Sequence, residues 1–191
     1  MPPQKNPLLS LDLSNKEHTQ LQLSKLVSTV ITRFYPLDVI PDRDQVCRVR
    51  VFYLEIMKVL HERIAVHTTL YALLYVQRLV SALNIRIHPD AAFGVLTIAF
   101  HLADHTSNDE VVPLRHWAKL TRIDNQSLVK MKREFLSSIQ FNLMVGPDEY
   151  TEWIQIVSAL MNYSPSSPVS PTMKKPESMA EPMGFNSIPI L

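Results

Sequence analysis

The residues that most constrain the fold of this chain form an almost unbroken apolar run at 91–103, Ala-Ala-Phe-Gly-Val-Leu-Thr-Ile-Ala-Phe-His-Leu-Ala. A helix of this composition has no polar face to give to solvent, so other elements must surround it. Its thirteen residues span about 20 Å as a helix, well short of the ~20 residues that cross a bilayer. Alanine and glycine form strands poorly and let neighbouring helices approach closely. We therefore predict a central core helix here.

The glycine content favours an all-α fold. Three glycines among 191 residues are too few for the tight turns of a β-sandwich or barrel. A chain of this length has room for one domain with a substantial core and for tails. Because prolines and polar residues gather at both ends, we divide it into a disordered lead-in at 1–13, a helical domain at 14–162 and a disordered Pro/Ser-rich tail at 163–191.

Apolar spacing predicts three helices before the central one. Ser14 and Glu17 have the form of a capping box, which starts a first helix that Tyr35-Pro36 ends. A second helix is expected at 49–63, where the alternation at 48–51 leaves an extended segment as the alternative. Thr68 or Thr69 is expected to cap a third helix that runs to Leu83.

Four further helices complete the expected architecture. Pro89 is placed to start the central helix, and Pro113 to open a short helix after a polar loop at 105–110. Asp124 is expected to cap the next helix, and Gly146-Pro147 separates it from a final amphipathic helix. The pattern is five helices from about 48 to 144 with one flanking helix on each side.

Charge and cysteine content restrict the partners and the compartment. The net charge of +1 gives no overall field toward nucleic acid or membrane, so we expect neither as a partner. A local basic patch remains open as a site for an acidic partner, although a solvated face is favoured: Lys119, Arg122, Lys130, Lys132 and Arg133. A single cysteine excludes an internal disulfide and a cysteine-based zinc cluster. With no apolar run behind a basic start, we expect a cytoplasmic and/or nuclear protein.

Residue patterns for catalysis are weak. Phosphate-binding loops need clustered glycines, and the three glycines of this chain are far apart. The Gly-x-Ser-x-Gly motif of serine hydrolases is also missing from the sequence. Cys47 is interpreted as a buried filler and not as a nucleophile. His101, Asp104 and His105 have the spacing of a metal site, but without an evident fourth ligand a structural role is favoured. We expect no enzyme activity, no cofactor and no small-molecule substrate.

Three phrases together resemble a cyclin box. Residues 69–79, Thr-Leu-Tyr-Ala-Leu-Leu-Tyr-Val-Gln-Arg-Leu, resemble the "ALxYIDRL" helix, and Trp-Ala-Lys-Leu at 117–120 resembles the "YAKVGGI" segment. Residues 131–143, Met-Lys-Arg-Glu-Phe-Leu-Ser-Ser-Ile-Gln-Phe-Asn-Leu, resemble the "LExxFLxxIxFNL" helix of the fungal phosphate-pathway, Pcl and cyclin Y branch. Val-Gly-Pro-Asp-Glu-Tyr at 145–150 is similar to the phrase that typically follows. The resemblance covers about 50 to 160.

The resemblance implies a five-helix box around a buried third helix, and a regulatory subunit that binds and activates a cyclin-dependent protein kinase and helps to select substrates. Such a subunit acts by favouring one of two kinase conformations. It also implies a lysine and a glutamate that grip the kinase; the lysine position falls on or near Ile64 and the glutamate position on Ala103-Asp104, and we take Arg63 and Asp104 as the substitutes. The chain departs from the family pattern there, at Thr121-Arg122 in place of a glycine pair, and at Lys132 in place of a frequent glutamate.

Lys58, Trp117 and Phe141 complete the expected partner-binding set, with a core role as the alternative for the two aromatic residues. Ser164, Ser167 and Ser170 each precede a proline, the form that proline-directed kinases accept, so they are possible phosphorylation sites. The alternatives to a kinase regulator are a cyclin-fold adaptor or scaffold without a kinase, and a helical metal-binding protein.

Overall fold

A computed structural model describes residues 16–59 and 66–162, and in these ranges every regular element is an α-helix. The all-α prediction is confirmed. The seven helices of these ranges are α1 (Lys16–Arg33), α2 (Arg43–Val59), α3 (Val66–Leu83), α4 (Pro89–Ser107), α5 (Leu114–Thr121), α6 (Asn125–Ser138) and α7 (Pro147–Asn162).

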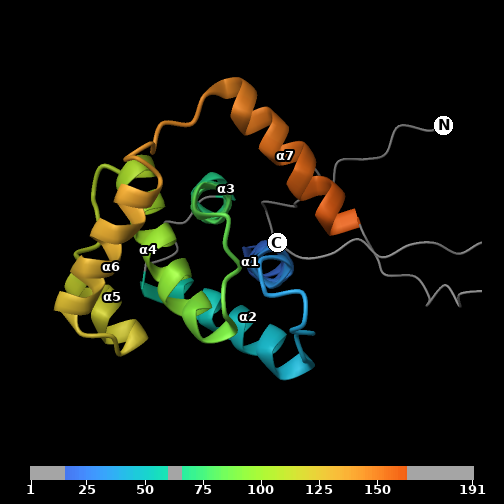
Figure 1. Cartoon of the computed structure of the whole chain (residues 1–191), viewed down its shortest axis with the longest axis horizontal. Coiled ribbons are helices and arrows are strands. Elements are labelled where there is room, and N and C mark those ends of the chain that lie inside the picture. The colour runs from blue at the N-terminus through green and yellow to red at the C-terminus, as the bar shows by residue number, and fades with distance from the viewer. Residues whose placement is uncertain (1–15, 60–65, 163–191) are drawn as a thin grey trace, which may run out of the picture.

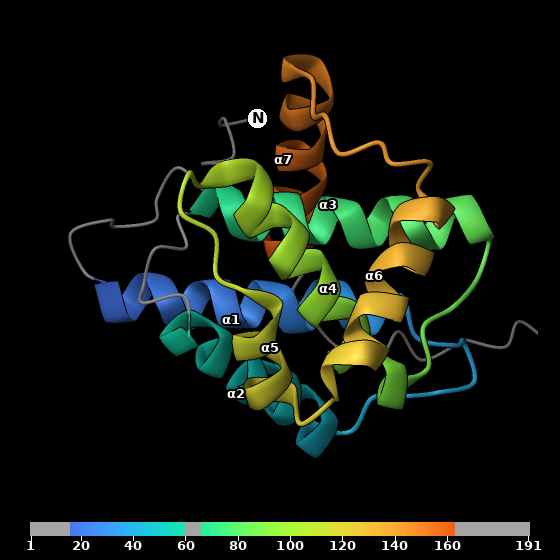
Figure 2. The same ribbon diagram turned by 90° about the vertical axis from the view of Figure 1, so that its left-hand side faces the viewer.

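The helices surround α4. Figure 2 shows α4 running obliquely across the middle of the view, with α3 and α1 behind it, α2 below, and α5 and α6 in front. Figure 1 shows α7 along the edge of the molecule beyond α3 and α1. The most extensive helix contacts are those of α3 with α4 and of α1 with α2. Each side of α4 thus meets a neighbouring helix.

The central helix is buried as its composition predicts. All nine residues from Leu96 to Asp104 are buried, and both Leu96 and Phe100 have no exposed surface. Full burial of each such side chain contributes roughly 1.5–3 kcal/mol to folding. The small residue Gly94 permits a close helix contact, because a Cβ there would lie 2.5 Å from the terminal methyl of Met131 on α6.

Local signals set several helix starts as expected. Asp124 Oδ1 accepts from the backbone N–H of Ser127 at 2.9 Å and so caps α6. Pro89 is the first residue of α4, and α5 begins directly after Pro113. The apolar stripe of the first helix is also buried, from Leu23 to Ile31.

Three local predictions were wrong. The helix α2 begins six residues earlier than expected, because Asp42 Oδ1 accepts from Gln45 N at 2.6 Å and caps a polar first turn. Thr69 lies inside α3, where its hydroxyl is 3.1 Å from Tyr53 Oη, and Thr68 is also buried inside that helix. Cys47 is exposed and is not a core filler.

Two helix ends also differ from the boundaries predicted from the sequence. The helix α4 continues to Ser107 through the expected polar loop, and α6 ends at Ser138, five residues before the predicted stripe ends. The expected lead-in at 1–13, the capping serine Ser14 and the tail from 163 onward lie outside the described residues.

Candidate functional site

The described positions among those expected to bind a partner differ in their exposure. Lys58 is exposed on α2 and forms an ion pair with Glu55 at 2.6 Å. Arg63 and the serines Ser164, Ser167 and Ser170 lie outside the described residues. Of the other expected positions, Asp104 and Trp117 are buried and Phe141 is exposed.

Asp104 is engaged within the chain. Its side chain is at the end of the buried part of α4, where only 1% of the residue is exposed. One carboxylate oxygen accepts from Asn108 Nδ2 at 2.7 Å and the other from the backbone N–H of Val112 at 3.0 Å. The carboxylate therefore fixes the segment between α4 and α5, and in this conformation a partner cannot contact it directly.

Trp117 belongs to the core. It has no exposed surface, and its ring meets the edge of His101 with centroids 5.9 Å apart. Its Nε1 has no hydrogen-bond partner among the described residues. The core alternative stated from the sequence fits this position.

Phe141 lies on the connector between α6 and α7, residues 139–146, and 67% of it is exposed. Met144, on the same connector, is 84% exposed. The backbone before Phe141 closes α6 with two bonds, from Gln140 N to Ser137 O and from Phe141 N to Leu136 O. Both Gln140 and Phe141 have positive φ values, 54° and 56°. Residues other than glycine adopt this backbone conformation at a cost of about 1–2 kcal/mol each.

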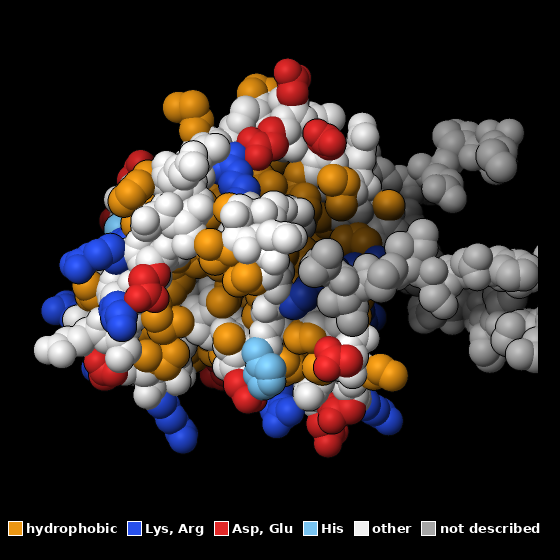
Figure 3. Space-filling model, in the orientation of Figure 1, with side chains coloured by type: hydrophobic (Ala, Val, Ile, Leu, Met, Phe, Trp, Pro, Cys, Tyr) orange, Lys and Arg blue, Asp and Glu red, His pale blue; other side chains and the backbone are white. Residues whose placement is uncertain are grey.

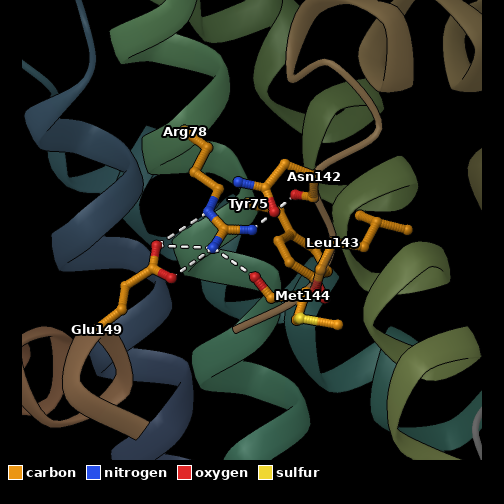
Figure 4. A network of polar contacts seen from close by, with 6 residues as sticks. All are labelled: Tyr75, Arg78, Asn142, Leu143, Met144 and Glu149. Atoms are coloured by element: carbon orange, nitrogen blue, oxygen red, sulfur yellow. Dashed lines mark hydrogen bonds and ion pairs between the residues drawn. The ribbon is translucent and has the colours of Figure 1, made fainter. Parts of the chain in front are cut away.

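Arg78 holds this connector in place from α3. Its guanidinium donates to the carbonyl oxygens of Asn142 at 2.6 Å and Met144 at 2.8 Å, and it binds both carboxylate oxygens of Glu149. Figure 4 shows the guanidinium between Glu149 and the connector backbone. Planar, bidentate contacts of this kind give strong and directional fixation.

Tyr75, one turn earlier on α3, adds a second anchor. Its hydroxyl donates to Leu143 O at 2.8 Å and lies 3.1 Å from Thr106 Oγ1 on α4. Burial raises the pKa of Tyr75, so the phenol keeps its proton to donate. Tyr75 and Arg78 together fix a short segment that presents Phe141 and Met144 to solvent.

Sequence reasoning missed this clamp of Tyr75, Arg78 and Glu149. Tyr75 and Arg78 stand in the phrase at 69–79, and Glu149 stands in the phrase at 145–150. The resemblance identified both phrases but did not predict that they contact each other. The four-residue spacing that identifies helix neighbours gives no sign of a partner 71 residues away.

A second polar cluster joins α4, α5 and α6. Lys132 Nζ lies 3.1 Å from His101 Nε2, and the rings of His101 and His105 meet edge to face at 4.5 Å. Burial, with the charge of Lys132 and the ring of His105, lowers the pKa of His101 to about 3. Burial and Lys132 also lower the pKa of the more exposed His105. His101 is thus neutral at physiological pH.

The cluster does not have the geometry of a metal site. In the described ranges there is no group of three histidine, cysteine or acidic side chains that could hold a metal ion. The oxygens of Asp104, the acidic residue of the expected set, accept instead from Asn108 and Val112.

An apolar groove of about 580 Å³ lies over α2 and α4. Phe52 and Phe93 form its floor with rings edge to face at 5.0 Å, and Val51 and the exposed Cys47 line it. Figure 3 shows acidic and basic side chains intermingled on one face of the molecule, as expected for a chain of net charge +1.

A comparison of the chain with protein-family models, with curated proteins and with solved structures found no match. None of the helices in the described part of the chain is long and apolar enough to cross a membrane.

Proposed function

We propose that the protein is a cyclin-like regulatory subunit, which binds and activates a cyclin-dependent protein kinase and does not itself catalyse phosphoryl transfer. The observation that carries this proposal is the clamped connector, residues 139–146, with two large apolar side chains exposed on it. A fixed segment with exposed apolar groups suits protein binding, because little ordering entropy is lost when the partner docks.

The helix arrangement is compatible with the proposal. The buried α4 is the third of the five helices α2 to α6, and α1 and α7 stand before and after these five in the chain. The resemblance to a cyclin box places the same number of helices around a buried third one. The phrases that carry the resemblance also contain the clamp, since Arg78 stands in the phrase at 69–79 and Glu149 in the phrase at 145–150.

The proposed partner contact is apolar at its centre. Phe141 and Met144 would dock against apolar side chains of a kinase helix, with Lys58 as an exposed cation elsewhere on the surface. Buried aromatic anchors dominate binding energy at such interfaces, and removing one typically costs 2 kcal/mol or more. Differential contacts with the active kinase conformation would then shift the kinase toward it.

Affinity purification from cells tests the proposal. We expect the wild-type chain to retain a protein kinase and Phe141→Ala to lose at least 90% of it, following from a loss of roughly 2 kcal/mol. Ile40→Ala is the matched control, because Ile40 is 87% exposed on a different loop and its substitution should leave recovery unchanged.

Two results would contradict the proposal in different ways. If the wild-type chain retains other proteins reproducibly but no kinase, the adaptor or scaffold alternative takes its place. If Phe141→Ala and Ile40→Ala retain equal amounts of kinase, the chain binds a kinase through another surface.

A further inference from the structure

Lys132 is a partly buried cation without an acidic partner. Its Nζ contacts His101 Nε2 at 3.1 Å, and none of the ion pairs of the described residues includes it. Its neighbour Lys130, in contrast, is exposed and lies 3.9 Å from Glu134. Cations withdrawn from water are ordinarily paired with a negative charge, so the position of Lys132 leaves a favourable interaction unmade.

Two buried nitrogen atoms, one on His101 and one on Trp117, whose ring lies 5.9 Å from that of His101, are without hydrogen bonds among the described residues. Neither His101 Nδ1 nor Trp117 Nε1 has a partner among the described residues, although His101 is 2% exposed and Trp117 is fully buried. The indole N–H can only donate, and a buried donor left unsatisfied costs roughly 1–3 kcal/mol. What this cluster lacks is therefore an acceptor.

The cluster extends to the surface through His105. This exposed ring meets His101 at 4.5 Å, and it can donate one N–H when neutral and two when protonated. The acidic group nearest to it along the chain is Asp104, which raises the pKa of His105 but has its oxygens bonded to Asn108 and Val112. Among the ion pairs of the described residues there is none between Asp104 and Lys132.

We propose that Lys132 and His105 form a receptor for one carboxylate, supplied by an aspartate or glutamate side chain of a partner protein, with the buried His101 positioning Lys132 from behind through their 3.1 Å contact. The inference rests on the proposed function only for the identity of that partner, the kinase. One ammonium beside an imidazole N–H matches a single negative charge, and a carboxylate is an acceptor-only group. The positive charge at position 132 thus selects a partner with an acidic side chain facing α6.

A titration of the full chain tests the receptor without the partner. The probe is hexaglutamate, with hexaglutamine as its uncharged match, observed through the indole N–H signals of the two tryptophans. We expect hexaglutamate to shift the Trp117 signal and to leave Trp153 unchanged, because the Trp153 indole is bonded to Leu70 O at 3.0 Å elsewhere in the core. Hexaglutamine should shift neither signal.

Variants at position 132 separate charge from structure. We expect Lys132→Gln to weaken the hexaglutamate response about tenfold or more and Lys132→Arg to preserve it, as for a charge-assisted contact. Lys130→Gln is the matched control on the same helix and should behave as the wild type. Circular dichroism and Tm verify that each variant is folded. A Trp117 signal that hexaglutamate does not move, or moves equally in Lys132→Gln, would overturn the receptor.

Purification from cells connects the receptor to the partner. The Lys132→Gln chain should retain less kinase than the Lys130→Gln chain. If the wild type retains no kinase while hexaglutamate still acts through Lys132, the proposed function fails and the carboxylate receptor stands. If kinase is retained equally by both variants and hexaglutamate has no effect, the receptor fails and the proposed function stands.

Discussion

Replacement of Arg78 by methionine tests whether the clamp holds the connector. The substitution keeps an unbranched side chain in a position where 13% of the arginine side chain is exposed. It removes the pair with Glu149 and the bonds to the carbonyl oxygens of Asn142 and Met144. Released from these contacts, the connector no longer holds Phe141 in one orientation.

The size of the effect follows from exposure. Hydrogen bonds to charged groups contribute about 1.5–3 kcal/mol when buried, but water can replace the two carbonyl contacts here, which are at exposed residues. The side chain of Glu149 is 42% exposed, so its pair with Arg78 contributes about 1 kcal/mol. We expect Arg78→Met to lower the free energy of unfolding by roughly 2–3 kcal/mol in total.

Urea unfolding of four chains measures these quantities: the wild type, Arg78→Met, Glu149→Gln and the double variant. Glu149→Gln alone should cost about 1 kcal/mol, and the double variant should cost less than the sum of the two single changes. A cost for Arg78→Met no larger than that for Glu149→Gln would show that the carbonyl contacts do not hold the connector. Strictly additive changes would show that the ion pair contributes nothing to stability.

Three other predictions concern the remaining helices. The pKa of His101 is lowered from its ordinary value of 6.5 to about 3 in the folded chain. Between these pH values the unfolded chain binds the proton and the folded chain does not, so the free energy of unfolding should fall as the pH drops from about 6.5 toward 3. In urea unfolding, His101→Gln should flatten this decline. The exposed thiol of Cys47 should react with a thiol reagent in the native chain as fast as in urea, and protection of the native thiol would contradict its exposure. Arg122, the C-cap directly after α5, has a φ of 58°, so Arg122→Gly should raise the free energy of unfolding by up to about 1 kcal/mol and Arg122→Ala should not; equal effects would refute the strain argument.

The core was predictable because hydrophobicity acts locally along the chain. The run at 91–103 has no polar face, so its burial in α4 followed from composition alone. The cap at Asp124 was also readable, because the acceptor and the N–H it binds are three residues apart. The cap at Asp42 has the same form but precedes a turn with few apolar residues, which hid the start of α2.

The site was less predictable because its contacts join distant parts of the chain. Lys132 and His101 are 31 residues apart, and Arg78 binds main-chain oxygens, which every residue type possesses. The resemblance to a cyclin box placed Asp104 among the partner-binding residues, whereas its neighbours Asn108 and Val112 determine what the carboxylate does. Phe141 was named for the same surface, and its exposure keeps it available to a partner.

The most direct test of the account is whether the purified chain activates a kinase recovered with it from cells. The kinase is separated from the chain, and peptide phosphorylation is measured as the wild type or Phe141→Ala is added back, with Ile40→Ala as control. The account predicts saturable activation by the wild type and the control, and little by Phe141→Ala at equal concentration. Kinase activity that is unchanged by the wild-type chain would contradict it.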